Sequence, residues 1–265
     1  MAQRNKPVQE DEVLLNLIAP TRKARRNSST RASKVAAGEQ KVIKDKFQEQ
    51  RQVPPLRPMN DRQADYINLI NTKSLVIATG FAGTSKSYVP TVMACDKWRK
   101  GEINRIYLSR PATSDSASLG LFKGTVQDKY APWLLPVLSI MYDRLGRNVV
   151  DLAIAAGDIT FIPLETIKGM SFGKSTFVIV DEAEDVTVKE AKSIVTRQGG
   201  GTMVLCGDLE QSCLDERSGL AWLVKMVEKY PHLGDTTGFV DFNRPSDIVR
   251  SEACKSWILA MRKEV

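Results

Sequence analysis

The sequence has a single histidine, His232, and only four cysteines among 265 residues. Cys95, Cys206, Cys213 and Cys254 form no C-x-x-C pair and have no histidine nearby in the sequence. This pattern argues against a structural zinc site and against a disulfide framework, so we expect reduced thiols that are buried or inert. With one histidine, a Ser-His-Asp catalytic triad is also disfavoured.

Long hydrophobic runs are missing as well. No apolar stretch approaches the roughly 20 residues that a transmembrane helix needs, and the N-terminal residues MAQRNKPVQEDE contain no apolar signal core. The apolar content (42%) and the charged content (26%) are ordinary for a globular protein. We therefore expect a cytoplasmic protein without a membrane partner, with either one large or two small domains.

The positive charge is confined to one end of the chain. The formal net charge is +7; residues 1–57 carry 13 Lys and Arg against 6 Asp and Glu, and the rest carries 25 of each. The stretch TRKARRNSSTRASK is too polar to offset chain entropy by burial. We interpret residues 1–57 as a basic, largely flexible extension with helices at 11–18 and 38–52, and residues 58–265 as the folded domain. Such an arm binds phosphate backbones, although a solubilising tail explains it equally well.

The most informative stretch is SLVIATGFAGTSKS, residues 74–87. An apolar run leads into Gly80–Ser87, which fits the phosphate-loop pattern G-x-x-x-x-G-K-[ST] at every fixed position except Ser85. In such a loop the backbone N–H groups surround phosphate oxygens, Lys86 reaches the β- and γ-phosphates, and the Ser87 hydroxyl binds Mg²⁺. A solvated turn is the alternative for the loop taken alone. The nucleotide-binding residues predicted here are Gly80, Phe81, Ala82, Gly83, Thr84, Ser85, Lys86 and Ser87.

Strand patterns alternate with helix patterns over residues 60–262. Strands are expected at 74–79, 105–110, 158–163, 174–181, 202–206 and, at the edge, 237–242. Helices are expected at 60–72, 88–99, 127–145 (broken near its prolines), 149–156, 187–196, 219–230 and 245–262. Pro90 should kink or shorten the second of these helices, because proline lacks an N–H. The alternation predicts an α/β fold, a parallel sheet between helices, with ligands beyond the carboxyl ends of the strands.

Two further motifs follow strands. In FVIVDEAED (177–185), Asp181 at the strand tip can hold Mg²⁺ and Glu182 can polarise the attacking water. In GDLEQ (207–211), Gln211 can sit against the γ-phosphate and report its loss. Carboxylates and turns are common at strand ends, but the three motifs in this order predict a nucleoside triphosphate hydrolase that uses Mg²⁺.

The motifs also resemble the PhoH-like ATPase family, whose core is similar to superfamily 1 helicases. The matching segments are GFAGTSKSY, YLSRPA, LGLFKG, PLETIKGMSF, VIVDEAED, VTRQGGG, MVLCGDLEQ, RSGL and DIVRS. The resemblance implies a RecA-like P-loop NTPase fold, ATP with Mg²⁺, and often a homo-oligomer such as a hexameric ring. The chain resembles a short stand-alone member; if it is phage-encoded, its location would be the host cytoplasm.

The resemblance carries over to further residues. Gln63 matches the glutamine that reads adenine, and Asp208 in GDLEQ joins the nucleotide-binding residues. Arg250 matches a late arginine that acts as an arginine finger in cis or across a subunit boundary, with a helix ion pair as its alternative. The predicted catalytic residues are Lys86, Glu182, Gln211 and Arg250, and the predicted metal ligands are Ser87 and Asp181.

The chain departs from the family pattern at three positions. Ser85 replaces a loop glycine, so that its Cβ crowds the phosphate; Glu184 stands where glutamine is usual and adds negative charge near the γ-phosphate; Pro90 enters a helix. Each departure is expected to slow turnover. Three functions therefore stay open: an ATP hydrolase coupled to RNA or single-stranded DNA, a nucleotide-switched assembly protein with little turnover, and a small-molecule kinase. GDLEQ, DEAED and the lack of an arginine-rich lid argue against the kinase.

Overall fold

The structure is a computed structural model that describes residues 53–111 and 126–262. The basic arm up to residue 52, with the helices predicted at 11–18 and 38–52, lies outside the described residues. The chain divides into two compact units. The first comprises Pro54–Ala117 together with Thr160–Val265, and the second contains the helices α5 (Val126–Leu145) and α6 (Arg147–Ala156). α5 is one continuous helix, so the break expected near its prolines was wrong.

A six-stranded sheet forms the centre of the first unit. The strands are β1 (Leu75–Gly80), β2 (Arg105–Ser109), β3 (Ile159–Phe161), β5 (Thr176–Val180), β7 (Thr202–Cys206) and β8 (Thr237–Phe242). Their order is β3-β2-β5-β7-β1-β8, and the pairings among β2, β5, β7, β1 and β8 are all parallel. The predicted parallel α/β sheet is confirmed, with β8 at the edge. Two short strands that the sequence pattern did not indicate, β4 (Phe172–Gly173) and β6 (Gln198–Gly199), pair separately.

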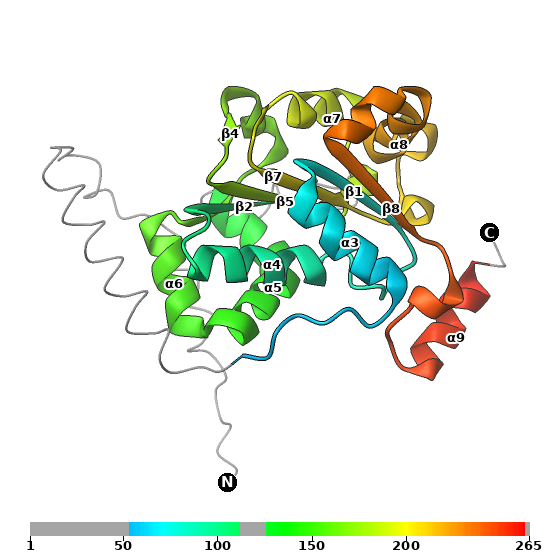
Figure 1. The fold of residues 1–265 in the computed structure, drawn as a ribbon, viewed down its shortest axis with the longest axis horizontal. Coiled ribbons are helices and arrows are strands. Elements are labelled where there is room, and N and C mark those ends of the chain that lie inside the picture. Colours follow the sequence, from blue (N-terminus) through cyan, green and yellow to red (C-terminus); the bar gives the residue numbers. More distant parts are fainter. Residues whose placement is uncertain (1–52, 112–125, 263–265) are drawn as a thin grey trace, which may run out of the picture. The chain divides into compact units, whose positions relative to one another are not determined.

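Helices cover both faces of this sheet (Figure 1). α3 (Asp61–Thr72) and α4 (Tyr88–Arg99) lie on one face, and α7 (Val188–Val195) and α8 (Gly219–Lys229) on the other. The helix expected over 245–262 was placed too early: a short 3₁₀ turn at Pro245–Asp247 precedes α9 (Glu252–Met261), which begins where the Ser251 side chain caps it. A serine cap marks the start because its oxygen accepts an otherwise unpaired first-turn N–H.

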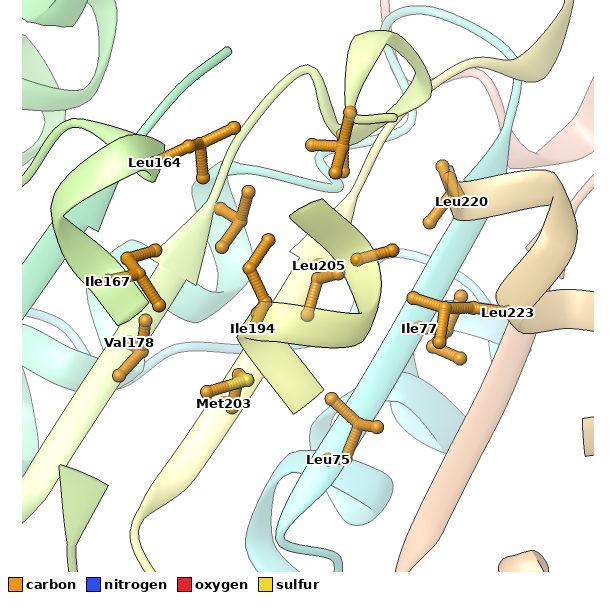
Figure 2. Close-up of a cluster of buried hydrophobic side chains, with 14 of the residues drawn as sticks. Leu75, Ile77, Leu164, Ile167, Val178, Ile194, Met203, Leu205, Leu220 and Leu223 are labelled. Atoms are coloured by element: carbon orange, nitrogen blue, oxygen red, sulfur yellow. The ribbon is translucent and has the colours of Figure 1, made fainter. Parts of the chain in front are cut away.

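The side chains of alternate strand residues pack against α7 and α8 to form one hydrophobic core (Figure 2). Leu75 and Ile77 of β1 contribute to it, together with Ile194 of α7 and Leu223 of α8. Every residue of β1 is buried, as expected for a central strand covered on both faces. A central strand held this firmly provides a rigid base for the loop that follows it.

Pro90 is accommodated within the first turn of α4. The helix runs over Tyr88–Arg99 as predicted, so the expectation that Pro90 would shorten it was wrong. Proline has no N–H to donate to the carbonyl four residues earlier, that of Lys86. The buried Tyr66 hydroxyl donates to that carbonyl instead, at 2.9 Å. A helix from elsewhere in the chain therefore supplies the hydrogen bond that Pro90 removes.

We expect Tyr66→Phe to lower the free energy of unfolding by about 1–3 kcal/mol, because it leaves a buried carbonyl without a donor. In a Pro90→Ala background the restored backbone N–H can take the place of the hydroxyl, so the same change should cost less. Urea denaturation of the four proteins of this double-mutant cycle measures the difference. Equal costs in both backgrounds would show that the hydroxyl does not replace the missing donor.

Candidate nucleotide site

The carboxyl ends of the central strands are tied together at one edge of the sheet. The Asp181 N–H donates to Ser109 O at 3.0 Å, Gly207 N–H to Ala78 O at 3.1 Å, and Phe81 N–H to Phe242 O at 2.9 Å. These bonds bring the phosphate loop after β1, the acidic pair after β5 and the GDLEQ turn after β7 side by side, as the sequence predicts.

The loop after β1 presents a row of backbone donors. Within the described chain, no hydrogen bond is made by the backbone N–H groups of residues 82–87. The loop is held by other contacts: Thr84 Oγ1 donates to Phe81 O at 2.9 Å, and Gly80 has a φ of +115°. Backbone N–H groups that have no acceptor and lie together at the start of a helix form an anion-binding site. Phe81, Ala82, Gly83 and Thr84 thus lie where the sequence expects them.

Lys86 turns back into its own loop. Its Nζ donates to Gly80 O at 2.7 Å and to Phe81 O at 2.6 Å, and the side chain is buried. Burial lowers the pKa of the Lys86 ammonium, while the nearby Asp208 carboxylate opposes the shift. The ammonium is thus already inside the loop, next to the free N–H groups.

Ser87 and Asp181 meet although they lie far apart in the sequence. The Ser87 hydroxyl donates to Asp181 Oδ1 at 2.5 Å. Burial raises the pKa of Asp181, and the hydrogen bond from Ser87 counteracts this shift. A hydroxyl and a carboxylate in contact beside an anion site fit the oxygen donors that Mg²⁺ takes from protein when phosphates supply the rest.

Glu182, the second residue after β5, adopts left-handed backbone angles (φ +51°, ψ +42°). Its Oε1 lies 3.3 Å from Nη2 of Arg110, the residue that follows β2. Both side chains are partly exposed. Glu182 is therefore accessible to water and has a cation beside it.

Glu184, in the short turn Ala183–Asp185 after β5, is buried against the end of β7. Its Oε2 accepts the Asp208 N–H at 3.2 Å, and a Cβ added to Gly207 would lie 2.0 Å from the same oxygen. Burial, together with a hydrogen bond to and repulsion by Glu182, raises the pKa of Glu184 to about 9. The carboxyl group is neutral at pH 7, so the expectation that Glu184 adds negative charge was wrong, because ionisation depends on burial. A protonated glutamate matches the glutamine usual at this position in hydrogen bonding and charge.

We expect Glu184→Gln to stabilise the protein, and to do so increasingly as the pH rises. The folded pKa of about 9 lies above the unfolded value near 4.5, so the folded state binds the extra proton and stability falls between these pH values. The slope is at most about 1.4 kcal/mol per pH unit. Urea denaturation of both proteins at pH 6 and pH 8.5 tests this; a stability difference that is the same at both pH values would contradict a raised pKa.

Ser85 is a non-glycine residue in a glycine conformation, with a φ of +70°. The left-handed region costs an L-residue about 1–2 kcal/mol, so the strain matches the glycine that the motif prefers here. Asp215, in the short turn before α8, has a φ of +48° and offers a comparison outside the loop.

We expect Ser85→Gly to raise the free energy of unfolding by about 0.5–1 kcal/mol, because relief of strain exceeds the added chain entropy of the unfolded state. Nucleotide turnover should be retained or raised. Asp215→Gly should stabilise similarly without changing turnover. A loss of turnover in Ser85→Gly would show that the serine has a positive role.

Asp208 and Gln211 contact one another in the turn after β7. Asp208 Oδ2 accepts from Gln211 Nε2 at 2.9 Å, and Asp208 Oδ1 accepts the Glu210 N–H at 3.2 Å. Gln211 is exposed, whereas Asp208 is buried close enough to Lys86 to act on its pKa. Both predicted residues thus border the loop.

Gln63 and Arg250 flank the phosphate loop from elsewhere in the chain. Gln63 is buried; its Oε1 accepts the Met59 N–H at 2.9 Å and its Nε2 donates to Thr84 O at 3.2 Å. Reading adenine with this amide would require exchanging those bonds, and that role stays a prediction. Arg250 precedes α9, and a Cβ added to Gly83 would lie 2.6 Å from its Cγ. The exposed Arg250 thus lies over the loop of its own chain.

Two residues at this site were not predicted from the sequence motifs. Cys206, the last residue of β7, is buried with Sγ 3.5 Å from Asp181 Oδ1, and burial raises the pKa of its thiol. Cys206 could have been predicted from its position at the end of a strand. Arg262 lies at the end of α9, and no sequence motif there indicates that it belongs to the site. Cys213 and Cys254 are exposed rather than buried.

A parallel sheet between helices, with a phosphate loop and an acidic strand tip at its carboxyl edge, is the arrangement of a P-loop fold. Residues 55–262 match the PhoH-like protein family. The chain belongs to this family, as the resemblance of its motifs predicts.

Two relatives from bacteria show how much of a family member this chain covers. The chain is 29% identical over 208 residues to Protein PhoH of Escherichia coli (strain K12), covering 77% of this chain and 58% of that protein. It is 33% identical over 169 residues to the PhoH-like protein of Bacillus subtilis (strain 168), covering 63% and 53%. The chain thus spans little more than half the length of these relatives.

Two helicase structures are similar at low sequence identity. The UvsW helicase from Bacteriophage T4 is 12% identical with a TM-score of 0.40, covering 76% of this chain and 67% of that chain. The Pif1 helicase from Candida albicans is 15% identical with a TM-score of 0.35, covering 72% and 41%.

Among the helices of the described chain, none combines the length and apolar character needed to cross a bilayer.

Proposed function

We propose that this chain binds ATP with Mg²⁺ at the phosphate loop and hydrolyses it. The observation that carries the proposal is the contact between Ser87 Oγ and Asp181 Oδ1, at 2.5 Å, beside a loop whose N–H groups at residues 82–87 make no hydrogen bond within the described chain. Hydrogen-bond donors for phosphate thus lie next to oxygen ligands for a divalent cation. A nucleoside triphosphate bound with its cation requires both.

Each side chain then has a distinct role. Lys86 exchanges the carbonyl oxygens of its loop for phosphate oxygens. Ser87 and Asp181 would hold Mg²⁺, which when bound offsets the charge of the phosphates. Glu182, partly exposed and paired with Arg110, takes a proton from the attacking water. Glu184 stays neutral beside Glu182 and so keeps repulsion of the γ-phosphate low.

Residues at the rim complete the proposed site. Gln211 would report loss of the γ-phosphate, and its hydrogen bond to Asp208 supports this role by holding its side chain in the turn after β7. Arg250 supplies positive charge in cis, since its side chain already covers Gly83. These roles are assigned by matching each residue to the motif of the family.

We further propose that hydrolysis is coupled to RNA or single-stranded DNA. The support is the excess of basic residues in residues 1–57, because the remainder of the chain is charge-balanced. Neutralising the arm by changing Arg22, Lys23, Arg25 and Arg26 to glutamine should reduce the slope of log Kd against log salt, by about 0.7 for each phosphate that the arm no longer neutralises. Lys225→Gln with Lys229→Gln, at two exposed positions of α8, is the matched control. An unchanged slope in the arm variant would exclude a role for the arm.

Phosphate release with and without single-stranded RNA tests the proposal as a whole. We expect release from ATP without any added acceptor, which also excludes a small-molecule kinase, and faster release with RNA. If wild type binds no ATP in calorimetry, the proposal fails at its first step.

A nucleotide-switched assembly protein is the second candidate function. The observation that favours it is the Arg110–Glu182 ion pair, which engages the predicted general base with a cation. In that case ATP binds tightly, a homo-oligomeric ring forms, and little phosphate is released. Sedimentation with and without ATP, run beside the hydrolysis assay, separates the two candidates.

A further inference from the structure

Arg262 joins the end of α9 to two separate parts of the nucleotide site. Its guanidinium carbon lies 3.7 Å from the centroid of the Phe81 ring in the phosphate loop. Its Nη2 lies 3.5 Å from Asp208 Oδ1, and its Nε pairs with Glu210 Oε2 in the turn after β7. One cation thus bridges the loop after β1 and the turn after β7.

The acidic groups around Arg262 do not depend on it. Asp208 already accepts hydrogen bonds from the Glu210 N–H and from Gln211 Nε2, at 3.2 and 2.9 Å. The Glu210 side chain is half exposed, so water can solvate it. Arg262 can therefore leave both carboxylates, because the buried Asp208 keeps its two hydrogen bonds and the nearby Lys86 ammonium.

α9 is not held in place by a core of its own. The helix has no buried residue, and Trp257 and Met261 are 71% and 58% exposed. The segment before the helix is anchored, since Ile248 is buried and the Val249 N–H donates to Gly83 O at 3.0 Å. The far end of α9 is joined to the site through Arg262, so a change in the partners of Arg262 can move the helix about that anchor.

A bound triphosphate would compete with Asp208 and Glu210 for this side chain. Its terminal phosphate brings negative charge next to Asp208, which repels it, whereas a planar guanidinium binds phosphate oxygens through two parallel N–H groups. Stacking on Phe81 keeps the guanidinium plane over the loop while its N–H groups change partners. A diphosphate leaves the last phosphate position empty and offers no such competition.

We propose, on the basis of the proposed function, that Arg262 is a nucleotide-contacting residue that exchanges the carboxylates of Asp208 and Glu210 for the terminal phosphate of a bound nucleoside triphosphate. α9 thereby adopts a different position in the triphosphate state and the diphosphate state.

Calorimetry of Arg262→Ala with a non-hydrolysable ATP analogue and with ADP tests the contact. We expect the analogue to bind about 10- to 100-fold more weakly, the range for a hydrogen bond to a charged group, and ADP to bind as in wild type. Lys255→Ala is the matched control, because it removes a cation from the same helix whose partner, Glu252, lies within that helix. This control should leave both dissociation constants unchanged.

Trp257 fluorescence tests the movement of α9, with Trp257→Phe identifying its share of the signal. In wild type the analogue should change the signal and ADP should not; in Arg262→Ala saturating analogue should leave it unchanged. If Arg262→Ala weakens both nucleotides equally or neither, or keeps the signal change, the inference is overturned. If Arg262→Ala is unfolded at the assay temperature, Arg262→Lys takes its place, and an unaltered ratio of the two dissociation constants would then overturn it. A wild type that binds neither nucleotide contradicts the proposed function instead.

Discussion

Glu182→Gln is expected to lower kcat for ATP hydrolysis by about 10²- to 10⁴-fold, the usual loss when a general base is removed. Glu182 is the partly exposed member of a pair of neighbouring glutamates, whereas burial raises the pKa of Glu184 to about 9, so Glu182 is the residue proposed to accept a proton from water. Nucleotide affinity should stay within a few fold of wild type, because the change leaves the loop and Lys86 intact. Steady-state phosphate release and calorimetry measure the two effects.

The same substitution at Glu184 is the matched control. Its carboxyl group is protonated at pH 7, with a pKa raised to about 9 by burial and by Glu182, so an amide replaces it with the same charge and nearly the same shape. We expect kcat of Glu184→Gln near the wild-type value at pH 7. If Glu184→Gln inactivates the protein while Glu182→Gln does not, the roles of the two glutamates are reversed and the assignment of the base is wrong.

Lys86→Ala is expected to weaken ATP binding by on the order of 10²-fold, because it removes a cation that makes charge-assisted hydrogen bonds to phosphate. The ammonium is buried in the loop and needs only to leave the carbonyl oxygens of Gly80 and Phe81. Calorimetric titration with ATP measures the loss, and thermal unfolding checks that the variant is folded.

Lys73→Ala is a closely matched control for this variant. Lys73 also donates to two backbone carbonyl oxygens, those of Gly234 and Asp235 at 2.6 and 3.2 Å, but it precedes β1, at the amino end of the sheet. We expect a comparable change in thermal stability and no change in ATP affinity. Wild-type ATP binding by Lys86→Ala would show that the loop is not the nucleotide site.

The parts of the site that could be predicted from the sequence lie next to strands. Ser87 and Asp181 are 94 residues apart and form a 2.5 Å hydrogen bond, and this proximity follows from two parallel strands whose carboxyl ends share one edge. The strand pattern and the loop motif are local signals, so they require no knowledge of long-range packing. The same holds for Asp208 and Gln211 after β7.

Residues whose behaviour depends on burial or on distant partners were predicted less well. Glu184 was expected to be negative, and burial makes it neutral. Pro90 was expected to kink or shorten a helix; the helix is not shortened, and the hydroxyl of Tyr66 supplies the missing donor. Neither partner lies in the local sequence pattern on which those expectations were based.

The sequence by itself determined the strand order along the chain, the phosphate loop and the acidic pair, because each is encoded by neighbouring residues and by alternation of strands and helices. Only the tertiary structure decided that burial raises the pKa of Glu184, where Lys86 places its ammonium and that Arg262 reaches Phe81 and Asp208. These features depend on solvent exposure and on contacts between remote segments, and both arise only when the chain has folded.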